Sequence, residues 1–197
     1  MLVGYTISGN ASNDAEFFDG SEPEGTWCKE CGTCLNTEFV PSFLSISKSK
    51  KYDISYTQDL RTIFSENMAL FLSEVLNCAE IFKPIKTSWE NHYYVYPKIS
   101  LPFDAITRKT KFISPCSSCG GFRDIVGAHP AFLKVSAPIE NGLFKSDVTF
   151  SSYKSKHPLL FVSHEWMEKI KAQRFRGVVF HEVHSTNTPN PSFKRDA

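Results

Sequence analysis

The clearest periodic pattern in the chain predicts a helix from Asp59 to Glu80. Apolar residues recur there at steps of three and four, so they share one broad face of a helix. Asp59 or Thr57 is placed to cap the first turn, and Pro84 lies beyond the last turn. Cys78, near the end, is interpreted as a small buried apolar residue, because no His or Asp partner accompanies it.

A second helix is predicted from His164 to about Phe175, with Ser163 as its N-cap and Gly177 after its last turn. Acidic residues fall in its first turn and basic residues near its end, as the helix dipole favours. Short apolar or β-branched stretches predict strands around the two helices. These stretches are residues 1–8, 39–46, 89–99, 131–136, 159–162 and 178–183. The pattern therefore indicates an α+β fold, with a mainly antiparallel sheet and two principal helices.

Length and composition suit one globular domain. The chain has 197 residues, of which 41% are hydrophobic and 14% aromatic, so a substantial core can form. We expect a single domain over residues 1–184. The polar, proline-bearing end, residues 185–197, predicts a disordered tail.

Charge and hydropathy argue against several functional classes. The 22 Lys and Arg residues nearly balance the 21 Asp and Glu residues, which gives no support for nucleic-acid or membrane binding. No apolar run approaches the roughly 20 residues of a membrane helix. Residues 1–10 lack the basic start and apolar centre of a signal peptide. We therefore expect a cytoplasmic protein.

Two segments each carry a Cys-x-x-Cys pair followed by glycine. The first reads W-C-K-E-C-G and the second S-P-C-S-S-C-G-G. Such a turn directs two sulfurs to one point, and the next residue often takes a positive φ, where glycine costs least. In the cytosol, paired cysteines indicate metal ligands or redox centres before disulfides. We predict one tetrahedral Zn²⁺ site formed by Cys28, Cys31, Cys116 and Cys119.

The two Cys-x-x-Cys-Gly knuckles are far apart in the sequence. Between Cys31 and Cys116 lie 84 residues, whereas short zinc ribbons have about 15–20. A longer loop closes at little extra cost, about 0.6 kcal/mol per doubling. The expected site is therefore a zinc clasp across the domain, with Trp27 shielding the thiolates. Cys34 and His129 remain open as replacements for one of the four ligands.

Other chemistries are less well supported. Cys-x-x-Cys is also a redox motif, but glycine follows each pair and no βαβ unit flanks it. A zinc-ribbon-like nucleic-acid regulator usually has concentrated basic residues, which are spread out here. His181 and His184 stand three apart on a predicted strand, so they face opposite sides and form no metal pair. His164, near a helix start, is expected to be exposed. No H-E-x-x-H, phosphate-binding glycine loop or G-x-S-x-G motif is present.

With these motifs placed, the chain resembles the bacterial double-CXXCG proteins. The similarity rests on W-C-K-E-C-G, C-S-S-C-G-G, L-F-K-S-D-V and the closing segment L-L-F-V-S-H-E-W-M-E-K-I-K-A-Q-R-F-R-G-V-V-F-H-E-V. Some members look like immunity proteins of the myxobacterial swarming-inhibition toxin systems. The family's cysteines fall on Cys28, Cys31, Cys116 and Cys119. The resemblance implies a metal-stabilised, non-enzymatic α+β protein that binds and neutralises a cognate toxin.

Two further segments bear on this hypothesis. Residues 10–25 carry five acidic and no basic side chains. This stretch is interpreted as a solvated loop or, alternatively, as an acidic surface for a basic partner such as the toxin. The end of the chain, N-P-S-F-K-R-D-A, resembles the C-termini of reading frames carried on bacterial integron cassettes. Such an origin implies a mobile accessory gene, which suits a protective protein.

Overall fold

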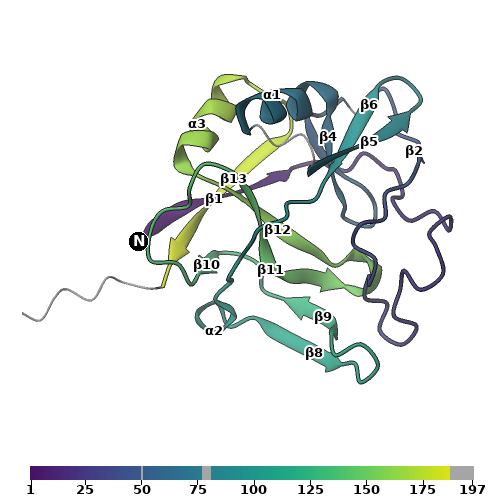
Figure 1. The fold of residues 1–197 in the computed structure, drawn as a ribbon, viewed down its shortest axis with the longest axis vertical. Coiled ribbons are helices and arrows are strands. Elements are labelled where there is room, and N and C mark those ends of the chain that lie inside the picture. The colour runs from purple at the N-terminus through teal and green to yellow at the C-terminus, as the bar shows by residue number, and fades with distance from the viewer. Residues whose placement is uncertain (50, 77–80, 187–197) are drawn as a thin grey trace, which may run out of the picture.

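The computed structural model describes residues 1–49, 51–76 and 81–186, which fold into two β-sheets and three α-helices (Figure 1). The larger sheet has the order β10-β13-β1-β12-β11-β9-β8, and β7 also pairs with β11. Its strands are β1 (Leu2–Gly9), β7 (Ser100–Leu101), β8 (Lys111–Pro115), β9 (Phe122–Val126), β10 (Ala131–Leu133), β11 (Leu143–Ser152), β12 (His157–Val162) and β13 (Val178–Ser185).

The smaller sheet has the order β2-β5-β6-β4-β3. Its strands are β2 (Phe43–Leu44), β3 (Ile54–Tyr56), β4 (Thr62–Ser65), β5 (Phe82–Thr87) and β6 (Asn91–Val95). The helices are α1 (Glu66–Leu76), α2 (Ala105–Arg108) and α3 (His164–Ala172). Most strand pairs are antiparallel; β10–β13, β11–β7 and β2–β5 are parallel. The predicted α+β class, with mainly antiparallel sheets and two principal helices, is confirmed.

One apolar core joins the two sheets. It contains Ile7 of β1, Phe64 of β4, Val162 of β12 and the inward faces of α1 and α3. Helices α1 and α3 lie side by side at one end of the molecule (Figure 1). None of the helices in the part of the chain that the structure describes is long and apolar enough to span a membrane.

The helix prediction for residues 59–80 is wrong in its first part. Ile63 and Phe64 lie in strand β4, which pairs with β3 on one side and β6 on the other. Both side chains are fully buried. Two adjacent apolar residues are compatible with the apolar face of a helix, but they are equally compatible with a strand that is buried on both faces. Helix α1 begins at Glu66, where the Ser65 hydroxyl accepts the Met68 amide at 3.2 Å. Residues 77–80, including Cys78, lie outside the described residues.

The predicted caps of that helix have a different role. Asp59 accepts the amides of Phe17 and Phe18 at 3.1 and 2.9 Å, and Thr57 accepts the amide of Arg61 at 2.9 Å. The two hydrogen bonds to Asp59 hold residues 10–25, the acidic loop, against the body of the protein. The interpretation of residues 10–25 as a solvated loop is therefore only half right. Phe17 is buried in a satellite core while Glu16 is exposed.

The remaining predicted elements are present, but their bounds differ from the predicted ones. Ser163 caps α3 by accepting the Trp166 amide at 3.2 Å, as predicted, but the helix ends at Ala172. The strand expected at residues 39–46 is limited to the two residues of β2, and the sequence does not predict β3, β5, β7, β9 or β11. Strand β13 runs to Ser185, whose amide donates to Met1 at 2.7 Å, so the tail prediction begins too early. Residues 187–197 lie outside the described part.

Candidate metal centre

The first knuckle is a loop closed by backbone hydrogen bonds. The Gly32 amide donates to the Cys28 carbonyl at 2.9 Å, and the Cys28 amide donates to the Thr33 carbonyl at 2.9 Å. Gly32 has φ +64°, a conformation that a residue with a side chain adopts at a cost. This geometry turns the Cys28 and Cys31 side chains to the same side of the loop.

The second knuckle repeats this geometry in the loop of the β8–β9 hairpin. The Gly120 amide donates to Cys116 at 3.0 Å, and the Cys116 amide donates to the Gly121 carbonyl at 2.8 Å. Gly120 has φ +70°. Strand β9 pairs with the end of β11 (Ser152↔Asp124), so the larger sheet carries this knuckle. The glycine after each Cys-x-x-Cys pair therefore has the positive φ that the sequence predicts.

The four predicted cysteines meet at one point. Their Sγ atoms all lie within 4.8 Å of one another. Cys28 Sγ is 3.6 Å from Cys116 Sγ, and Cys31 Sγ is 3.5 Å from Cys119 Sγ. Tetrahedral zinc with Zn–S bonds of about 2.3 Å separates its sulfurs by about 3.8 Å. The sulfur arrangement therefore fits a single metal ion, and the knuckles meet although 84 residues separate them.

A buried lysine connects the two knuckles. Lys156, just before β12, is 4% exposed. Its ammonium donates to the Thr33 hydroxyl at 2.6 Å and to the Phe122 carbonyl. Because the Thr33 oxygen accepts from Lys156, its own proton is free to point at Cys31 Sγ, 3.0 Å away. The lysine thus places a positive charge beside the sulfurs and holds one donor toward them.

The pKa values of the cysteine thiols in this cluster differ from one residue to another. Burial by itself raises the pKa of Cys31, but hydrogen bonds from Thr33 and the neighbouring thiols lower this pKa to about 6. The Cys119 amide lowers the pKa of Cys116, yet burial and the Cys28 and Cys31 sulfurs outweigh it and raise that pKa to about 12. Four thiolates this close therefore require a cation to compensate their charge.

The alternative ligands do not join the sulfur cluster. Cys34 Sγ donates to the Asn36 carbonyl at 3.3 Å, and burial raises the pKa of this thiol. The His129 ring centroid lies 5.1 Å from that of His181, with the two rings tilted by 55°. His184 lies by Phe132 and Glu182, so the two strand histidines have separate neighbours. Among the described residues, the four knuckle cysteines are the one group of three or more potential ligands that comes together.

Trp27 does not lie where the sequence suggested. Its indole N–H donates to Glu22 at 2.9 Å, and its ring packs on Phe18 at a centroid distance of 4.2 Å. The ring that lies against the first knuckle belongs to Tyr153, 3.3 Å from where a Cβ on Gly32 would stand. Sequence reasoning missed both Tyr153 and Lys156, because nothing in their local pattern distinguishes them from exposed loop residues.

Comparison with known proteins adds no assignment: no protein-family model, curated protein or solved structure matches the chain.

Proposed function

We propose that Cys28, Cys31, Cys116 and Cys119 bind one structural Zn²⁺ that fastens the first knuckle to the β8–β9 hairpin. The observation that carries this proposal is the closed set of four sulfurs within 4.8 Å. A metal with four protein thiolates keeps no open position for water or substrate, so it stabilises without catalysing. Structural zinc contributes an apparent binding free energy of about 10–16 kcal/mol, comparable with the whole stability of a domain.

Elemental analysis of the native protein, with a count of reactive thiols, tests the metal assignment. We expect one zinc per chain and four thiols protected until a chelator is added. Thiolate sets also suit iron, which the same analysis detects. Cys119→Ser should lose the metal, whereas the matched control Cys34→Ser should keep it. Metal-free native protein with four reactive thiols would refute the proposal.

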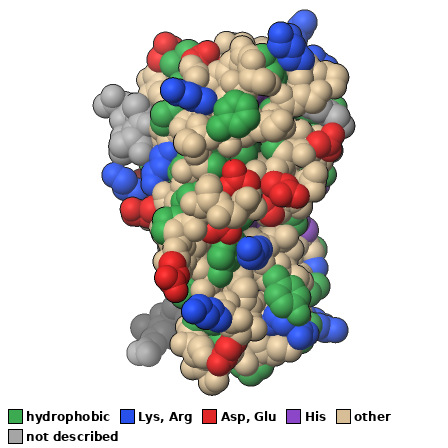
Figure 2. Space-filling model, turned by 90° about the vertical axis from the view of Figure 1, so that its right-hand side faces the viewer, with side chains coloured by type: hydrophobic (Ala, Val, Ile, Leu, Met, Phe, Trp, Pro, Cys, Tyr) green, Lys and Arg blue, Asp and Glu red, His purple; other side chains and the backbone are tan. Residues whose placement is uncertain are grey.

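We further propose that the chain is a non-enzymatic interaction protein that neutralises a cognate bacterial protein toxin. Support comes from the resemblance of both knuckles and the closing segment to double-CXXCG immunity proteins, and from a metal set closed to catalysis. Figure 2 views the face that bears the N-terminal loops, and acidic side chains gather across its middle. The acidic residues of loop 10–25 are the proposed contact for a basic surface on the toxin.

Charge reversal tests the contact. A toxic protein encoded beside this gene would be co-expressed with native protein and with the double variant Glu16→Lys/Glu24→Lys; both side chains are exposed. We expect the native protein to protect and bind, and the variant to bind more weakly while it stays folded. Glu168→Lys, on α3, is the matched control and should bind as the native protein does. Unchanged affinity in the double variant would rule out the acidic loop as the contact.

Two other functions predict different results in these assays. A thiol-redox enzyme would contain no metal and would cycle reversibly between dithiol and disulfide forms. A nucleic-acid-binding regulator would shift DNA or RNA in a salt-sensitive manner.

A further inference from the structure

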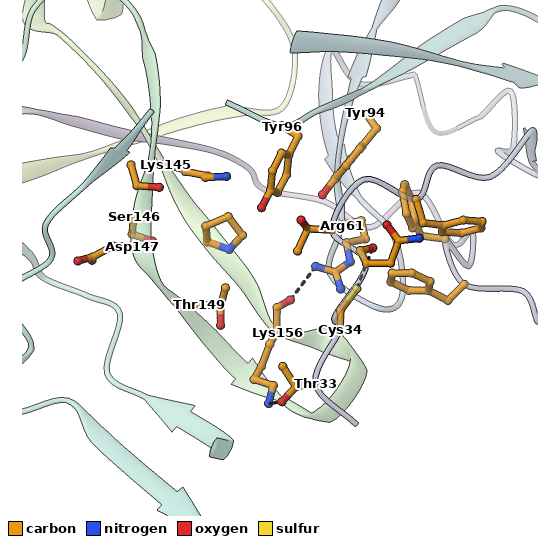
Figure 3. A pocket seen from close by; sticks show the side chains of 17 residues that line it. Thr33, Cys34, Arg61, Tyr94, Tyr96, Lys145, Ser146, Asp147, Thr149 and Lys156 are labelled. Atoms are coloured by element: carbon orange, nitrogen blue, oxygen red, sulfur yellow. Dashed lines mark hydrogen bonds between the residues drawn. The ribbon is translucent and has the colours of Figure 1, made fainter. Parts of the chain in front are cut away.

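A cavity of about 230 Å³ separates the two sheets beside the metal centre (Figure 3). The smaller sheet contributes Tyr94 of β6, with Arg61 just before β4 and Tyr96 just after β6, and strand β11 contributes Lys145 and its neighbours. Most of the lining is buried or half-buried. The exposed lining residues Thr37, Ser100 and Asp147 mark the mouth. Sites for drug-sized ligands occupy about 300–1,000 Å³, so this one suits a smaller molecule.

The cavity carries an excess of positive charge. Arg61 is 6% exposed and donates to the Lys156 and Lys154 carbonyls at 2.6 and 3.0 Å. Arg61 has no carboxylate within ion-pair distance among the described residues, whereas the Lys156 ammonium is directed at Thr33 and Phe122 by the knuckles. Asp147 is the one carboxylate of the lining, and it accepts the Phe103 amide at 2.8 Å. A buried cation without a counter-ion is costly, and an anion in the cavity would relieve that cost.

Among the described residues, one buried polar atom of the cavity lining lacks a partner, and it is a donor. Arg61 Nε is buried and has no hydrogen-bond partner in the described part of the chain. Figure 3 shows the hydroxyl ends of Tyr94 and Tyr96 turned toward the Arg61 side chain. Burial raises the pKa of Tyr94 to about 12, so this hydroxyl keeps its proton and can donate. The Lys145 ammonium lies 3.5 Å from the centre of the Tyr96 ring.

We propose that this cavity binds a small organic anion, a carboxylate or a phosphate ester, whose oxygens meet Arg61, the two tyrosine hydroxyls and Lys145. The stacked rings of Tyr94 and Tyr96, with centroids 6.2 Å apart, provide an apolar wall for a flat ligand body. Lys156 belongs to both sites, because its ammonium faces the first knuckle while its carbonyl holds Arg61. Arg61 and Lys145 supply the charge that the ligand meets.

Calorimetric titration with benzoate, inorganic phosphate and the neutral isostere benzamide tests the proposal on the native, metal-loaded protein. We expect millimolar or tighter binding of at least one anion and no binding of benzamide. The variants are Tyr96→Phe and Lys145→Gln, which leave the buried Arg61 in place. Each should weaken the bound anion about tenfold, the effect of losing one charge-assisted hydrogen bond.

Two variants serve as matched controls. Tyr93→Phe changes the tyrosine next to Tyr94 on β6, which packs against the apolar core between the two sheets. Lys86→Gln changes an exposed lysine on β5. Both should bind the anion as the native protein does. No binding of either anion at millimolar concentration by folded native protein would overturn the proposal. Equal affinity of Tyr96→Phe, Lys145→Gln and native protein would overturn it too, because the anion would then bind elsewhere. This titration tests anion binding alone, so its outcome does not depend on whether the protein binds a toxin.

Discussion

Replacement of Lys156 by methionine should weaken metal binding, because this buried lysine places a positive charge against Thr33 of the first knuckle and against Phe122, next to the second knuckle. Its ammonium donates to Thr33, whose hydroxyl contacts Cys31, and to the carbonyl of Phe122, three residues after Cys119. Methionine has a similar length and fills the same space without the charge. A tetrathiolate set around a divalent ion has two negative charges in excess, which the ammonium partly offsets.

The expected magnitude follows from these contacts. Loss of a group that orients or charges the metal ligands lowers affinity by about 10- to 100-fold, which is about 1.4–2.8 kcal/mol. Each hydrogen bond from a charged donor contributes about 1.5–3 kcal/mol, so the metal-bound fold should also lose stability. The unpaired Phe122 carbonyl adds to that loss, while the apolar side chain of methionine offsets part of it.

Competition with a chromophoric chelator measures this affinity directly. The matched control is Lys154→Met, two residues earlier, where the lysine side chain is 54% exposed and lies over Trp27 at 4.7 Å. The control should bind zinc as the native protein does. If a folded Lys156→Met variant holds zinc as tightly as the control, the lysine does not compensate the thiolates, and the reasoning fails.

Three other predictions concern the fold. Gly32→Ala and Gly120→Ala should each cost about 1–2 kcal/mol by denaturant unfolding, because both glycines have positive φ, whereas Gly121→Ala should cost less. Ser65→Ala should destabilise by about 1 kcal/mol and increase amide exchange at the start of α1; a larger exchange effect from Thr57→Ala would contradict the observed helix start. Stability should fall as pH drops below about 6.5, because burial lowers the pKa values of His92, His129 and His157, so the unfolded chain takes up protons first. Urea midpoints measured at roughly pH 8 and pH 5.5 check this sign, and a higher midpoint in acid would refute it.

Features that depend on a few adjacent residues could be predicted from the local sequence. A Cys-x-x-Cys turn followed by glycine specifies its own backbone, so Cys28, Cys31, Cys116 and Cys119 were identified without knowledge of the fold. The same holds for the Ser163 cap of α3 and for the apolar, β-branched strands near the two ends of the described chain. In each case the local pattern and the tertiary contacts favour the same conformation.

Features that depend on distant partners could not be predicted from local sequence, because the packing of the two sheets creates them. Ile63 and Phe64 form a strand because β3 and β6 flank them, although their spacing also fits a helix. Lys156 looks like an ordinary loop lysine until the fold brings Thr33 and Phe122 to its ammonium. The cavity around Arg61 forms where the two sheets meet, from residues between Phe17 and Pro158. Burial and pairing across such sequence distances depend on how the sheets pack, and local spacing does not encode them.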